Sequence, residues 1–262
     1  MNFIDSHCHI DTAKFDEDRD AMLQRAADAG ITDFIVVGAS GSLEQAQSTV
    51  AFAKGKEHFF ATVGVHPHEA EKLDDSWWPQ LCELAAQPDV VAVGESGLDF
   101  FYDNCPKQLQ AGRFVDHIKL AISLGKPIIC HIRDAHDEAI AILSEHAAGK
   151  VDVIIHCFTG TPADATRYAK LGFAISFSGI VTFKGKAAQP VRDSVALVPH
   201  NQLLLETDAP FLAPVPMRGK RNEPAFLVET AKLVAQLKGI ELAELAEITT
   251  KNTQRLFALT SQ

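Results

Sequence analysis

The chain has 262 residues, of which 47% are hydrophobic, and its 24 Lys and Arg against 34 Asp and Glu give a formal net charge of −10. This composition is typical of a globular protein with a well-buried core, and it excludes a disordered, fibrous or low-complexity chain. Because an acidic chain lacks the broad basic face that duplex binding needs, an anionic ligand would have to be held by metal ions and a local cluster of cations.

The sequence offers no apolar run of the roughly 18 residues that a membrane span requires, and Asp5 stands where a signal peptide would be hydrophobic. Its five cysteines are scattered without a Cys-x-x-Cys spacing, which favours reduced thiols that serve as packing residues. We therefore expect a cytoplasmic protein with no membrane partner and no obligate protein partner.

Short β-branched runs alternate along the chain with stretches of helical periodicity. The expected strands are 2–7, 32–38, 59–65, 90–94, 127–131, 152–156, 173–177 and 203–206. The expected helices are 17–29, 43–54, 76–87, 106–124, 136–147, 162–171, 187–196 and 224–238, followed by a surplus helix at about 242–257.

Eight strand and helix units are the number that closes a single (β/α)₈ TIM barrel, an α/β fold, and we expect one domain over residues 1–262. The competing arrangement is an open, doubly wound sheet. The barrel is favoured because candidate ligands follow both the first and the last strand, and only a closed ring brings those strands side by side. The surplus helix should pack across the outside of the barrel.

Candidate metal ligands begin with the run Asp5-Ser6-His7-Cys8-His9 at the end of the first expected strand. Alternate side chains of a strand point to opposite faces, so His7 and His9 share one face and Cys8 faces away. Further candidate ligands each stand at the end of another apolar run: Glu95, His131, His156 and Asp208. Barrel active sites lie at the carboxyl ends of the strands, so these side chains should converge on a metal site, with imidazole and carboxylate ligands that suit zinc, manganese or magnesium.

Other side chains near the strand ends are candidates for substrate contact. His66 ends the third strand, which carries no predicted ligand, and is expected to meet substrate or pack behind the site. Glu206 shares a strand face with Asp208, so it is either a supporting acid or a substrate contact. Arg133 lies just beyond a ligand-bearing strand end. The role of His68 is left open, and the remaining histidines are expected at the surface or at helix caps: His58, His117, His136, His146 and His200.

Cations follow the last two expected strands, where barrels commonly seat a phosphate. They are Lys184, Lys186, Arg218, Lys220 and Arg221. Since the planar fork of arginine suits phosphate oxygens, Arg218 and Arg221 are the predicted substrate contacts. The aromatic residues of the same loops could stack nucleobases, although packing into the barrel mouth is the preferred interpretation for most of them: Phe100, Phe101, Tyr102, Phe158 and Phe183.

Several segments resemble the TatD family of metal-dependent hydrolases, in the order in which the family has them. They are DSHCH (5–9), GVHP (64–67), VGESGLD (93–99), PIICHIR (127–133), HCFTG (156–160), LLETDAP (204–210) and PVPMRGKRNEP (214–224). The resemblance implies an amidohydrolase-type barrel with up to two divalent ions. It also implies the pairing of ligands: His7 and His9 with Asp208 on one ion, His131 and His156 on the other, and Glu95 as the bridge.

The family includes Mg²⁺- or Mn²⁺-dependent deoxyribonucleases, some of them exonucleases that work from the 3′ end. We therefore expect two divalent ions, Mg²⁺ or Mn²⁺ with Zn²⁺ as the alternative, and hydrolysis of single-stranded DNA by metal-activated water. The expected catalytic residues are Asp208, Glu95 and His66, with Asp208 both binding metal and taking a proton. The alternatives are hydrolysis of another bond, such as an aminoacyl-tRNA ester or a small amide, and a metal-stabilised scaffold without catalysis.

Overall fold

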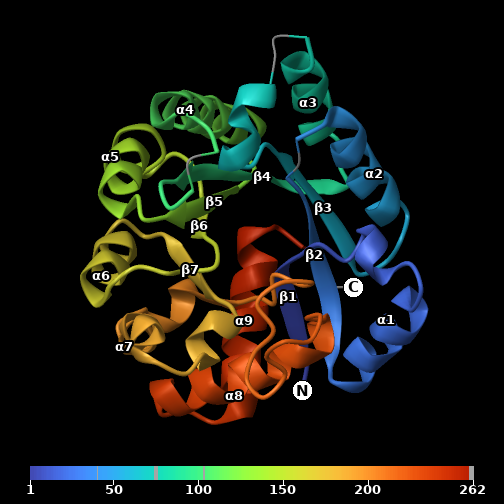
Figure 1. Cartoon of the computed structure of the whole chain (residues 1–262), viewed down its shortest axis with the longest axis vertical. Coiled ribbons are helices and arrows are strands. Elements are labelled where there is room, and N and C mark those ends of the chain that lie inside the picture. Colours follow the sequence, from blue (N-terminus) through green and yellow to red (C-terminus); the bar gives the residue numbers. More distant parts are fainter. Residues whose placement is uncertain (40, 74–75, 103, 260–262) are drawn as a thin grey trace.

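A computed structural model describes residues 1–39, 41–73, 76–102 and 104–259. Within them, parallel strands pair in sequence order from first to last and alternate with helices that surround them (Figure 1). The strands are β1 (Phe3–Cys8), β2 (Ile31–Ala39), β3 (Phe59–Gly64), β4 (Val90–Asp99), β5 (Ile128–Arg133), β6 (Val153–Ile155), β7 (Ala174–Phe177) and β8 (Leu203–Leu205). The α-helices are α1 (Arg19–Asp28), α2 (Leu43–Ala53), α3 (Trp78–Ala85), α4 (Lys107–Leu124), α5 (His136–His146), α6 (Pro162–Lys170), α7 (Gln189–Val195), α8 (Leu227–Lys238) and α9 (Leu242–Leu256).

The first and last strands meet at their carboxyl ends. Beyond β8, the backbone N–H of Asp208 donates to the carbonyl of His7 at 2.9 Å, and the N–H of His9 donates to the carbonyl of Ala209 at 2.7 Å. The Ser6 hydroxyl adds a 2.9 Å bond to the carbonyl of Leu205. These bonds join the two edges of the sheet, so the barrel is confirmed and the open, doubly wound sheet is wrong.

The strands are buried on both faces, which explains their continuous apolar sequences. One set of alternating residues packs beneath the surrounding helices, and the residues between them fill the barrel interior: Ile35, Ala92, Ile129, Ile154, Ala174 and Leu204. Leu256 and Phe257, at the end of α9, join this inner cluster. The surplus helix crosses the ring of strands beside β1 (Figure 1), and its last turn closes the barrel interior instead of lying wholly outside.

Local sequence signals mark several boundaries of the helices. Helix α6 begins with a capping box in which the Thr161 hydroxyl accepts from the Asp164 N–H and the Asp164 carboxylate accepts from the Thr161 N–H. Helix α4 ends at Gly125, whose φ of 62° lies in the left-handed region that glycine adopts without strain.

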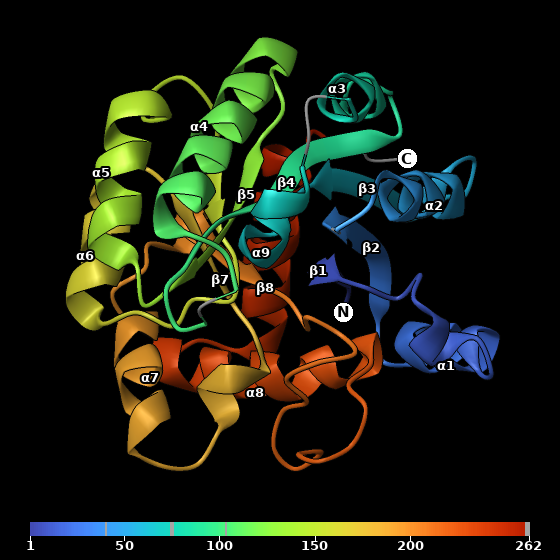
Figure 2. The ribbon, with the colours of Figure 1, turned by 45° about the horizontal axis from the view of Figure 1, so that its top comes forward.

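The turned view of Figure 2 shows the helices packed around the strands that they connect. None of the described helices is both long and apolar enough to span a bilayer.

Strand β4 is longer than expected. The prediction of 90–94 stopped at Gly94, because glycine reads as an interruption, but β4 continues to Asp99. The ladder with β5 is irregular between Val93 and Ser96 and then resumes, so Glu95 lies at a bulge within the strand and not at its end.

Candidate metal centre

The side chains predicted as ligands converge at the carboxyl end of the barrel. They come from β1, β4, β5 and the short segments after β1, β6 and β8. Three overlapping groups have ligand atoms within 4.8 Å of one another: His7, His156 and Glu206; His7, His9 and Glu95; and His66, Glu95 and His131. The described residues therefore contain clusters with the donor types and spacing that a metal ion needs.

The Glu95 carboxylate stands between the histidines. Its Oε1 atom lies 2.7 Å from Nδ1 of His131 and 2.8 Å from Nε2 of His156. Its Oε2 atom lies 3.4 Å from Nε2 of His7. Each oxygen thus faces a different set of nitrogen donors.

A second carboxylate lies on the β1 side of the cluster. Oδ1 of Asp208 is 3.4 Å from Nε2 of His9 and 3.8 Å from Nε2 of His7. Cys8 between the two histidines faces away and donates its thiol to the carbonyl of Ile35, as strand alternation predicts. His7, His9 and Asp208 therefore surround one point, on the opposite side of Glu95 from His131.

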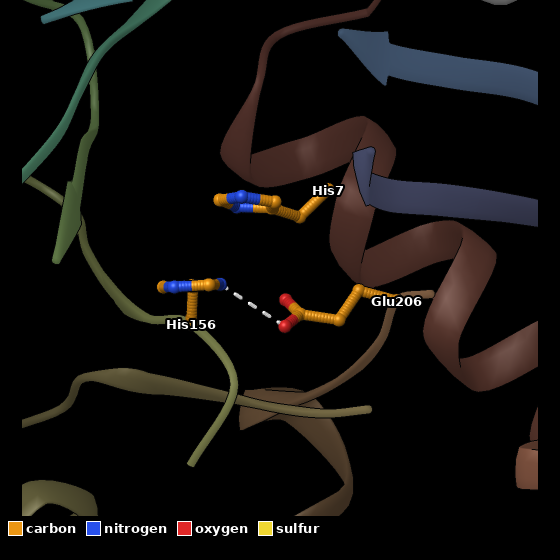
Figure 3. Close-up of side chains that lie close together, drawn as sticks. All are labelled: His7, His156 and Glu206. Atoms are coloured by element: carbon orange, nitrogen blue, oxygen red, sulfur yellow. Dashed lines mark hydrogen bonds and ion pairs between the residues drawn. The ribbon is translucent and has the colours of Figure 1, made fainter. Parts of the chain in front are cut away.

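Among the described residues, several buried polar atoms of this cluster lack a hydrogen-bond partner. His7 is fully buried, yet neither of its ring nitrogens has a hydrogen-bond partner among the described residues, and the same holds for Oε2 of Glu206. Figure 3 shows the His7 and His156 rings face to face with Glu206 beside them. The two ring centres are 3.9 Å apart. Since a buried polar atom without a partner is costly, a bound cation would satisfy these groups, and the residues present fit a metal site.

Hydrogen bonds behind the cluster fix which nitrogen each histidine presents. Oδ2 of Asp99 lies 2.9 Å from Nε2 of His131, so Nδ1 of His131 faces Glu95. Nδ1 of His156 instead bonds Glu206 at 3.1 Å, which leaves its Nε2 toward Glu95. Such outer partners orient ligating imidazoles and raise their basicity.

The same contacts set the charge of the cluster. Burial alone would raise the pKa of Glu95, but His156, His66 and His131 hold it well below its usual value. Burial alone would lower the pKa of His156, but Glu95 and Glu206 hold it well above its usual value. The carboxylates thus draw positive charge into the cluster, and a divalent cation can supply that charge in place of protons.

Glycines let β4 approach its neighbours closely enough to place Glu95. A Cβ on Gly97 would lie 2.0 Å from the carbonyl oxygen of His131, and one on Gly64 would lie 2.7 Å from the backbone of Gly94. Gly97 also has a φ of 152°, which side chains rarely adopt. Only glycine therefore allows β3, β4 and β5 to pack this tightly at the cluster.

Asp5 joins β1 to the segment after β8. Its Oδ1 atom accepts the Thr207 N–H at 2.9 Å, and its Oδ2 atom accepts the Thr207 hydroxyl. Burial raises the pKa of Asp5 to about 7, although the bonds from Thr207 act against that rise. This contact helps to hold His7 beside Asp208.

His66 lies inside the cluster. Its Nε2 atom is 3.3 Å from Nδ1 of His131 and 3.6 Å from Oε1 of Glu95, and burial lowers the pKa of His66 to about 3. His66 lies two residues beyond the end of β3 and not on the strand, and this segment supplies a neutral nitrogen donor near the centre. The Gly-Val-His-Pro run after an apolar strand is the signal that could have placed it there.

Among the predicted substrate contacts, Glu206 is fully buried and lies 3.1 Å from Nδ1 of His156, which it supports. The two terminal nitrogens of Arg221 each donate to Asp18 at 2.8 Å. Arg133 and Arg218 instead stack on aromatic rings, 3.8 Å from the centres of Phe101 and Phe183 respectively.

Two further histidines have roles that the sequence did not indicate. Nε2 of His68 lies 2.9 Å from Oδ2 of Asp99, the carboxylate that also holds His131. His117 was expected at the surface or at a cap and is fully buried, where its Nε2 accepts the N–H of Val65 at 3.1 Å. It therefore fixes the backbone just before His66.

Comparisons with known proteins place the chain in a family. A family model described as TatD related DNase matches residues 4–258. The chain belongs to the TatD family. It is 38% identical to a Bacillus subtilis protein named as the uncharacterized metal-dependent hydrolase YabD, over 97% of this chain and 98% of the relative.

Two other TatD relatives add a structure and an activity. The crystal structure of YJJV, a TatD homologue from Escherichia coli K12, has a TM-score of 0.90 at 33% identity and covers 98% of each chain. A protein from Erwinia billingiae named 3′-5′ ssDNA/RNA exonuclease TatD is 35% identical over 96% of this chain and 97% of its own length. The protein is therefore a metal-dependent hydrolase of the TatD family.

Proposed function

We propose that this TatD protein binds two divalent ions and uses them to hydrolyse phosphodiester bonds of single-stranded nucleic acid. The proposal depends most on Glu95, whose two oxygens face two different sets of histidines. His7, His9 and Asp208 would hold one ion. His131 and His156 would hold the other, with Glu95 shared between them and His66 adjacent.

The donor set is compatible with Mg²⁺ or Mn²⁺, with Zn²⁺ as the alternative. Carboxylate oxygens suit the first two cations, while imidazole nitrogens favour softer ions. A divalent ion bound here would lower the pKa of water from 15.7 toward about 7 and neutralise charge on the reacting phosphate. The chain's own residues then have to orient that water and receive its proton.

Asp208 is the best placed proton acceptor. Its side chain is 14% exposed, whereas those of Glu95, Asp99 and Glu206 are 1–4% exposed. A group that exchanges a proton with water must reach it within hydrogen-bond distance, and Asp208 is the most accessible carboxylate of the cluster. Glu95 would position donors on both sides, and His66 would meet the substrate or its leaving group.

The substrate class is supported by the relatives and by local charge. Relatives in Erwinia billingiae and Cronobacter sakazakii are named as 3′-5′ ssDNA/RNA exonucleases at 35% and 36% identity. Although the chain carries a net charge of −10, Arg133 ends β5 and Arg218 lies in the loop after β8, both at the carboxyl end of the barrel. We propose that these two arginines contact phosphates of the substrate and that the protein removes nucleotides from the 3′ end of single-stranded DNA. We also propose that residues 1–262 form one catalytic domain and that the protein acts in the cytoplasm.

A labelled oligonucleotide tests this function. Single-stranded DNA labelled at its 5′ end is incubated with the purified protein and Mg²⁺ or Mn²⁺, and products are separated by length. Removal from the 3′ end gives a ladder of labelled products that shorten with time. His131→Ala should abolish this shortening. His200→Ala changes an exposed histidine between α7 and β8 and should leave the shortening unchanged. An unchanged rate in His131→Ala, or hydrolysis only of carboxylic esters or amides, would refute the proposal.

A further inference from the structure

Exposed aromatic rings stand on both sides of the candidate metal centre. Among the described residues, the large hydrophobic side chains that are exposed include Phe101, Tyr102 and Phe211, at 54%, 46% and 49%. Phe101 and Tyr102 follow β4, and Phe211 follows β8. Burial would stabilise such rings, so their exposure does not contribute to folding.

The rings contact histidines of the site. The Phe211 ring centre is 6.1 Å from that of His9, and the Tyr102 ring centre is 5.3 Å from that of His68. Strands β4 and β8 are four places apart in a ring of eight, so they lie on opposite sides of the barrel. An extended chain that crosses the mouth would therefore meet an aromatic surface before and after the metal cluster.

Each aromatic surface carries its own cation. The Arg133 guanidinium lies 3.8 Å from the Phe101 ring centre and 4.9 Å from the Tyr102 ring centre. The Lys14 ammonium lies 4.4 Å from the Phe211 ring centre. In the part of the chain that the structure describes, neither cation forms an ion pair with a carboxylate, in contrast to Arg221.

This pairing of ring and cation matches the pairing of base and phosphate in a single strand. We propose that Phe101 with Tyr102 on one side, and Phe211 on the other, are stacking surfaces for bases that flank the scissile phosphate. Arg133 and Lys14 would contact the adjacent phosphates. The inference rests on the proposed nuclease function and assigns to these residues the task of holding the substrate.

Stacking of this kind has two consequences. Every base has a flat face, so the surfaces would tolerate any sequence. Bases within a duplex are already stacked on their neighbours, so the rings would select unpaired ends. A phosphodiester chain without bases would lose the contact while keeping the same reacting bond.

The test compares two substrates and matched variants. One substrate is a short single-stranded DNA, and the other is the same DNA with abasic residues at its two 3′-terminal positions. We expect Phe211→Ala and Tyr102→Ala each to raise KM for the normal DNA about fivefold or more, with little change in kcat. Phe211→Trp should retain the wild-type KM. Leu197→Ala, at an equally exposed residue after α7, should also have no effect.

The abasic substrate separates stacking from a general loss of structure. The wild type should bind it less tightly than normal DNA, and Phe211→Ala should show a smaller difference between the two substrates. The stacking proposal would be overturned if both alanine variants kept the wild-type KM for normal DNA. It would also be overturned if KM rose by the same factor from normal to abasic DNA in the wild type and in the variants. Either result would leave the nuclease function intact. A wild type that cleaves neither substrate would refute the nuclease function and this proposal with it.

Discussion

Replacement of Gly97 by alanine should destabilise the barrel and disturb the metal centre. The new methyl group would lie 2.0 Å from the carbonyl oxygen of His131 and 2.9 Å from its carbonyl carbon, at a backbone φ of 152°. A side chain in a glycine-only conformation costs about 1–3 kcal/mol, and forced overpacking costs about 1–3 kcal/mol more. The expected loss in the free energy of unfolding is therefore about 2–6 kcal/mol.

Gly112 provides the matched control. It lies on the exposed side of α4, and a Cβ there would meet nothing within 4 Å. Gly112→Ala should raise the free energy of unfolding by about 0.5–1 kcal/mol, because alanine favours the helix interior. Urea denaturation followed by circular dichroism, with chelator present so that metal does not contribute, measures both variants. A Gly97→Ala protein as stable as the wild type would refute the close approach of β4 to β5.

The other predictions concern the groups around the centre. Asp208→Asn should lower kcat by about 10²-fold or more while retaining most of the bound metal by elemental analysis, and equal loss of both would count against its role as proton acceptor. Glu206→Gln should weaken metal affinity about 10- to 100-fold, because His156 loses a charged partner, and a metal titration would show it. Burial lowers the pKa of His117 to about 4 from its ordinary value of 6.5. Between these two pH values the imidazole is protonated in the unfolded chain but neutral in the folded one. The free energy of unfolding should therefore fall by up to ~3 kcal/mol as the pH drops from 6.5 to 4. His117→Gln, which can still accept the Val65 N–H, should lose this part of the pH dependence, and an unaltered profile in denaturation at several pH values would contradict it.

The sequence was sufficient for the order of strands and helices because the strands are buried on both faces. Continuous apolar runs such as that of β6 stand out between helices, and their boundaries agree with the structure within a few residues. Strand β4 is the exception, because Gly94 interrupts the apolar run and the rest of the strand, Glu95–Asp99, contains polar residues. The packing of β4 against β5 outweighs that local signal.

The convergence of ligand types at strand ends was predictable for the same reason, since a barrel brings all carboxyl ends together. Contacts between distant side chains were not. The pairing of Arg221 with Asp18 depends on how the loop after β8 meets the segment before α1. The burial of Glu206 and His117 likewise depends on neighbours from other strands. Local pattern carries no information on such partners.

We propose above that two metal ions share Glu95 at the carboxyl end of the barrel. Anomalous diffraction from crystals soaked in Mn²⁺ tests it directly. We expect two peaks on either side of the Glu95 carboxylate, one among His7, His9 and Asp208 and the other beside His131 and His156, and both should weaken in Glu95→Gln. Peaks that avoid this carboxylate, or no peaks in crystals of active protein, would contradict the account.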